Sequence, residues 1–93
     1  MSKKPIILCA TERGRAVLFG YVDEHPTPGE PVTLHKARMV LRWRGGGIFR
    51  LASDGPRGDD TISPEVPAVT ETVWQEWFEV SSAAAEAWEA YGE

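Results

Sequence analysis

The sequence predicts an α+β domain: a small, mostly antiparallel sheet with a short middle helix and a C-terminal helix. Two observations support this. Short apolar runs alternate with breaks too short to hold the crossover helices of a parallel sheet, and the clearest helical pattern lies at the C-terminal end. The chain has 93 residues, which is room for one hydrophobic core. We therefore expect a single domain over residues 1–93.

The first two strands are expected at residues 5–10 and 16–22. The first is a continuous apolar run containing Ile6 and Ile7, and the second is apolar at odd and even positions alike. Both patterns are typical of strands buried on both faces. Gly20 inside the second run predicts a bulge or a close approach to the backbone. The proline-rich residues 23–31 predict a loop.

An arginine-rich strand is expected to follow, from Val32 to Arg44. Side chains alternate between the faces of a strand, so this interpretation divides the segment cleanly. A helix from Leu34 to Trp43 is the competing interpretation and gives a weaker division of faces. On a strand, Met39, Leu41 and Trp43 would form the core face, and Arg38, Val40, Arg42 and Arg44 the opposite face.

The second half of the chain predicts a short helix, a connection, a strand and a helix. Ile48 to Ser53 has helical spacing and ends before Gly55-Pro56, and residues 54–70 are expected to form a long surface connection. A strand over 73–80 would place Trp74 and Trp77 on opposite faces. The C-terminal helix over 81–91 begins at a serine cap and carries an apolar stripe of Ala84, Trp88 and Tyr91.

Composition excludes several classes of function. The net charge of −4 argues against a DNA-binding protein, which needs positive charge to neutralise phosphates. Cys9 is the single cysteine, so the chain makes no internal disulfide, and a small buried apolar role is expected. The apolar run before Thr11 is too short for a signal core or a membrane span, which predicts a cytoplasmic protein without membrane contact.

No pattern in the chain indicates an enzyme, a metal site or a cofactor. His25 and His35 have no clustered carboxylates or cysteines near them in sequence, so neither a zinc site nor a catalytic triad is indicated. Asp54, Asp59 and Asp60 lack the spacing of a calcium loop and are expected to be solvated.

The strongest candidate site is the arginine face together with the glycine turn that follows it. Guanidinium groups suit phosphate or carboxylate, glycines allow a close backbone approach, and the start of a helix offers free N–H groups. The alternative is a solvated sheet face whose arginines pair with Glu71, Glu76 or Glu79. The candidate ligand-binding residues are Arg38, Arg42, Arg44, Gly45, Gly46, Gly47 and Arg50.

Four segments carry a family resemblance: residues 15–20 (RAVLFG), 32–38 (VTLHKAR), 43–45 (WRG) and 51–55 (LASDG). Together they resemble a group of small uncharacterised proteins of tailed bacteriophages and prophages. The resemblance implies a phage origin and a place in the cytoplasm of the bacterial host, and it brings no established activity.

Small phage proteins of this kind often antagonise host defence, so the resemblance favours a non-enzymatic binding protein that sequesters an anionic, nucleotide-type ligand. A first alternative is an acidic inhibitor, similar to an anti-CRISPR protein, that binds a host defence protein handling nucleic acid. A second alternative is a structural or assembly protein of the phage. Four tryptophans in so short a chain also predict a homo-oligomer, because one chain is not expected to bury them all. The acidic residues that would serve the inhibitor are Glu65, Glu71, Glu76, Glu79, Glu86, Glu89 and Glu93.

Overall fold

The computed structural model describes residues 3–10, 16–43, 47–58 and 60–91. It confirms the α+β class, with a mostly antiparallel sheet, one middle helix and one C-terminal helix. The elements in chain order are β1 (Lys4–Ala10), β2 (Ala16–Val22), β3 (Val32–Arg42), α1 (Gly47–Ser53), β4 (Thr61–Ile62), β5 (Val66–Glu71), β6 (Trp74–Glu79) and α2 (Ser82–Ala90).

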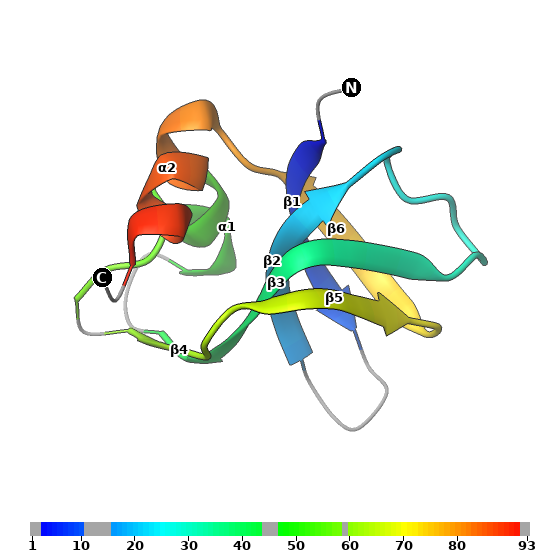
Figure 1. Ribbon diagram of the computed structural model, residues 1–93, viewed down its shortest axis with the longest axis horizontal. Helices are drawn as coiled ribbons and strands as arrows, with labels where there is room; N and C mark the ends of the chain where they lie inside the picture. The colour runs from blue at the N-terminus through cyan, green and yellow to red at the C-terminus, as the bar shows by residue number, and fades with distance from the viewer. Residues whose placement is uncertain (1–2, 11–15, 44–46, 59, 92–93) are drawn as a thin grey trace.

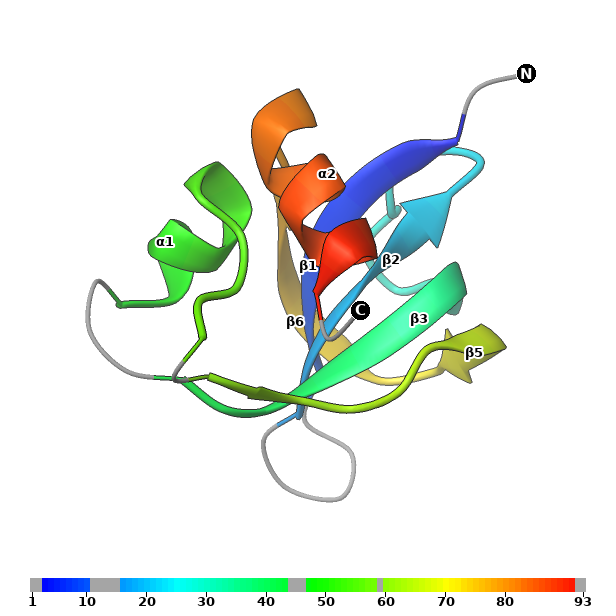
Figure 2. The same ribbon diagram turned by 60° about the vertical axis from the view of Figure 1, so that its left-hand side comes forward.

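The six strands form one antiparallel sheet with both helices on one of its faces (Figure 1 and Figure 2). The main order is β4-β3-β2-β1-β6. Strand β5 pairs with the first part of β3, whereas β4 pairs with its last residues. Because β1 and β2 lie in the middle of the sheet, their side chains are buried on both faces. This confirms what their continuous apolar runs predicted.

Two apolar cores lie on opposite faces of the central strands. The helix-side core includes Ile7 of β1, Phe19 of β2 and Trp88 of α2, whose ring stacks on Phe19 with centroids 4.7 Å apart. The second core includes Ile6 and Leu8, the neighbours of Ile7 along β1. Successive side chains of β1 therefore point alternately into the two cores.

The sheet curls around the second core, and the loop between β2 and β3 packs against two tryptophans of β6 that border this core. Trp74 and Trp77 of β6 pack on this core. The Trp74 indole Nε1 donates to the carbonyl of Glu30 at 2.7 Å, and the His25 ring stacks on Trp77 with centroids 4.7 Å apart. Both of these tryptophans, and likewise Trp43 and Trp88, pack against a core within a single chain. Homo-oligomerisation stays a prediction.

The predicted core face of β3 is wrong. Met39 and Leu41 are 37% and 58% exposed, whereas Val40 is buried in the helix-side core. Arg38 shares the face of Val40, as predicted, and reaches α2 on that side. Trp43, predicted to share the face of Met39, packs against the helix-side core instead. A bulge precedes these residues: Phe19 pairs with Arg38 and Tyr21 with His35, so β3 has one more residue than β2 between these pairs. The strand itself, rather than the alternative helix, is correct.

A second bulge overturns the expectation that Trp74 and Trp77 lie on opposite faces. Glu76 pairs with Cys9 and Trp74 with Ala10, which leaves Gln75 as the extra residue. Both tryptophans therefore contact the same core.

The segment over 54–70 is also more regular than predicted, because it holds β4 and most of β5. Each of these strands pairs with β3 on one side. Pro67 lies within β5, and a proline without an N–H is compatible with a strand at an edge. Pro67, one of the prolines that indicated a loop, thus lies in an edge strand.

The two predicted helices are confirmed. Ser81 is the N-cap of α2 and its side chain accepts a hydrogen bond from the backbone N–H of Ala84. Ala84 and Trp88 of the predicted stripe are fully buried. Within the described ranges, neither helix is long and apolar enough to span a bilayer.

Candidate functional site

Arg38, the first arginine of the predicted site, is hydrogen-bonded to backbone carbonyls at the end of α2. Its Nη1 donates to the carbonyl oxygens of Trp88 at 2.9 Å and Tyr91 at 3.0 Å, and its Nε donates to the Ser63 carbonyl at 3.0 Å. The guanidinium also lies 5.7 Å from the centre of the Tyr91 ring. The last carbonyls of a helix are short of donors, and Arg38 adds a charged donor to the Trp88 carbonyl, which otherwise accepts only a long bond of 3.4 Å from the Tyr91 N–H among the described residues.

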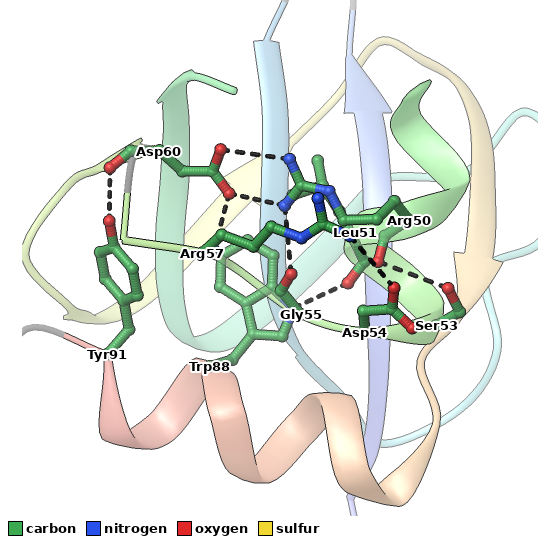
Figure 3. A network of polar contacts seen from close by, with 9 residues as sticks. All are labelled: Arg50, Leu51, Ser53, Asp54, Gly55, Arg57, Asp60, Trp88 and Tyr91. Atoms are coloured by element: carbon green, nitrogen blue, oxygen red, sulfur yellow. Dashed lines mark hydrogen bonds and ion pairs between the residues drawn. The ribbon is translucent and has the colours of Figure 1, made fainter. Parts of the chain in front are cut away.

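Arg50 is buried in an ion pair with Asp60 (Figure 3). Its Nη1 and Nη2 donate to the two carboxylate oxygens of Asp60 at 2.7 and 3.2 Å, and Nη1 also lies 3.3 Å from the Gly55 carbonyl. The backbone N–H of Arg57 donates to the same carboxylate at 2.8 Å, and the hydroxyl of Tyr91 donates to the Asp60 carbonyl. The network ties the loop after α1 to the end of α2.

The expectation that Asp60 is a solvated loop acid is therefore wrong. Its side chain is fully buried, because an arginine ten residues earlier in the chain neutralises it. Asp54 is exposed and pairs loosely with Arg57 at 3.7 Å, and Asp59 lies outside the described residues. In the part of the chain that the structure describes, no group of three potential metal ligands is present.

Of the remaining residues of the predicted site, two are described by the structure and three are not. Arg42 is exposed at the end of β3, and no described residue pairs with its guanidinium. Gly47 is the first residue of α1 and adopts the left-handed region, with φ 68°. Arg44, Gly45 and Gly46 lie outside the described residues. The alternative, in which the arginines pair with the strand glutamates Glu71, Glu76 and Glu79, does not describe Arg38 or Arg50. Arg38 contacts backbone carbonyls, and Arg50 contacts Asp60.

A different cluster of polar side chains forms a hollow on the helix side of the sheet. The hollow has a volume of about 350 Å³, which is within the range of pockets for small molecules. It is lined by residues from the segment before β1, from β2, from β3 and from α2. These residues are Lys3, Tyr21, His35, Lys36 and Glu89, and we refer to the site as the Lys36 hollow.

The β3 bulge shapes the Lys36 hollow. His35 and Lys36 are neighbours in sequence, and on a regular strand they would point to opposite faces, yet both line this hollow. Lys36 adopts φ 52°, a left-handed conformation that costs a residue with a side chain about 1–2 kcal/mol. Opposite the bulge, a Cβ on Gly20 would lie only 2.7 Å from the Leu34 Cβ. The close approach predicted for Gly20 is thus confirmed.

Charged and hydrogen-bonded groups surround the hollow. The Tyr21 hydroxyl donates to the Glu89 carboxylate, and burial together with this acceptor raises the pKa of Tyr21. Lys3 pairs with Asp23 and lowers the pKa of that carboxyl. The His35 Nε2 lies 3.9 Å from the Asp23 Oδ2. The Lys36 ammonium has no partner among the residues that the structure describes.

Sequence reasoning missed this hollow because its five residues come from four separate segments. Two signals pointed toward it: Gly20, which predicted a bulge or a close approach to the backbone, and the adjacent polar residues His35 and Lys36 within the strand.

Comparison with known proteins gives one match. A family model described as a domain of unknown function (DUF6948) matches residues 3–90. No curated protein and no solved structure matches the chain.

Proposed function

The chain belongs to the DUF6948 family, and we propose that it is a non-enzymatic binding protein whose Lys36 hollow takes a small anionic ligand. The observation that carries this proposal is the bulge in β3. It holds Lys36 in a strained conformation beside His35, at the mouth of a hollow large enough for a small metabolite. Residues held in sparsely populated backbone conformations concentrate at functional sites.

The charges of the described residues favour Lys36 as the anchor. Arg38 and Arg50 already have carbonyl or carboxylate partners, so using either for a ligand would break those internal contacts. The Lys36 ammonium can point three donors at a phosphate or carboxylate without breaking an internal contact. His35 and Lys3 also line the hollow, and Asp23 lies beside both of them.

A nucleotide signal of host defence is the ligand that the resemblance to phage proteins favours, and sequestering it would make the protein a host-defence antagonist. A single nucleotide is also of the size that the hollow accepts. This part of the proposal stands on the phage resemblance and on the volume of the hollow.

Isothermal titration calorimetry tests the proposal with inorganic phosphate, simple carboxylates, and mononucleotide, cyclic-nucleotide and ADP-ribose-type probes. We expect saturable binding that weakens as salt is added, because a partly exposed charge contact is screened. Lys36→Asn should lower the affinity about tenfold or more, since a hydrogen bond to a charged group contributes about 1.5–3 kcal/mol. Asparagine tolerates the left-handed region, so this variant keeps the bulge.

Two further variants make the result specific. Arg57→Gln removes an exposed cation away from the hollow and should leave the affinity unchanged. Arg42→Gln tests the arginine face directly: if it abolishes binding while Lys36→Asn does not, the ligand lies at the glycine turn and the hollow is excluded. Absence of binding by every probe overturns the proposal and leaves the acidic inhibitor and the phage structural protein as the functions to test.

A further inference from the structure

We infer that the ligand of the Lys36 hollow is two-ended, with an anionic group at one end and an amine or amino N–H donor at the other. The inference rests on the proposed function and adds a second recognition group, Glu89. This residue lies in the last turn of α2 and lines the same hollow as Lys36. The hollow therefore presents a carboxylate as well as an ammonium.

The Glu89 carboxylate has acceptor capacity to spare. An ionised carboxylate offers about four lone-pair sites and has no donor of its own. The Tyr21 hydroxyl donates to Oε2, and within the described ranges no other group donates to this side chain. Burial and Glu89 keep Tyr21 protonated, so the hydroxyl remains a donor and orients the carboxylate.

The charge balance of the hollow disfavours a ligand that is only an anion. Lys3 is paired with Asp23, which leaves Lys36 and Glu89 as two opposite charges facing one space. A simple anion is attracted by Lys36 and repelled by Glu89. A ligand with an anion and an N–H donor satisfies both groups at once.

Two kinds of small molecule have this chemistry. One is an amino acid, with a carboxylate and an ammonium. The other is a purine nucleotide, with a phosphate and an amino group on the base. Both present N–H donors to a carboxylate, and matched pairs of probes distinguish them.

The test is calorimetry with two pairs of probes that differ only in the amino group: γ-aminobutyrate against butyrate, and guanosine monophosphate against inosine monophosphate. For the pair that resembles the ligand, we expect the amino-bearing member to bind about tenfold more tightly. Glu89→Gln should reduce that preference to nearly none and should raise the affinity for the member without the amino group. The amide oxygen still accepts from Tyr21, so the variant keeps the internal hydrogen bond.

Glu86→Gln is the matched control, because Glu86 is an exposed acid of α2 that does not line the hollow. It should leave both preferences unchanged. If the members of both pairs bind equally well, and Glu89→Gln changes nothing, the two-ended ligand is excluded while the proposed anion site stands. If no member of either pair binds the wild-type protein while another anion of the calorimetry panel does, the two-ended ligand is excluded and the anion site stands. If no probe of the whole panel binds, the proposed function fails and this inference fails with it.

Discussion

The Arg38 guanidinium donates to the carbonyl oxygen of Trp88, 50 residues further along the chain, at 2.9 Å. Trp88 is fully buried and its indole Nε1 donates to the Leu51 carbonyl at 3.0 Å. Trp88 of α2 is therefore bonded to strand β3 through its carbonyl oxygen and to helix α1 through its indole N–H. An arginine that the sequence offered as a ligand contact instead stabilises the packing of both helices on the sheet.

We expect Arg38→Leu to destabilise the protein by about 1.5–3 kcal/mol, because it removes hydrogen bonds from a charged donor to three carbonyls. Denaturant unfolding measures this loss, and amide exchange should become faster in the last turn of α2. Arg42→Leu is the control and should change the stability by less than about 0.5 kcal/mol. Equal losses in the two variants would contradict the role of Arg38.

The buried pair of Arg50 and Asp60 predicts a larger effect. Asp60→Asn should cost about 3–5 kcal/mol, since it leaves a buried guanidinium without its counter-charge. Asp54→Asn removes an exposed acid whose ion pair with Arg57 contributes at most about 1 kcal/mol. Comparing the two urea midpoints checks the prediction, and similar midpoints would show that Asp60 is not needed for charge balance.

The left-handed conformation of Lys36 predicts an unusual order of stabilities. Lys36→Gly should be about 1 kcal/mol more stable than Lys36→Ala, because alanine retains the penalty of φ 52° and glycine does not. Thermal unfolding of both variants measures the difference. On a regular strand the order is reversed, since glycine weakens strands. An alanine variant that equals or exceeds the glycine variant would therefore argue against the bulge.

Burial and the neighbouring Glu76 raise the pKa of the Cys9 thiol to about 11, from an ordinary value of 9.0. The unfolded chain therefore loses this proton before the folded protein does. The thiol contributes stability that is fully present below pH 9 and is lost as the pH rises toward 11. Cys9→Ala should make the fall of the unfolding free energy between these pH values shallower. Tyr21, whose pKa is also raised, accounts for part of the remaining slope.

The sequence by itself determined the elements that depend on local chemistry. The serine cap and the buried stripe of Ala84 and Trp88 predicted α2, and the uninterrupted apolar runs predicted that β1 and β2 lie in the middle of the sheet. These patterns are local: a helix is determined by neighbours three and four residues away, and a strand buried on both faces needs apolar residues at every position.

Only the tertiary structure decided which side chains face each other. The β3 bulge depends on the register against β2, and the helices packed on one face of the sheet decide that Val40 is buried while Met39 is exposed. Arg38 finds its partners on α2, and the Lys36 hollow combines residues from both ends of the chain. An arginine carries the same charge whether it meets solvent, a ligand or a carbonyl group. Its role follows from which groups the fold brings within hydrogen-bonding distance, and those groups lie far away in sequence.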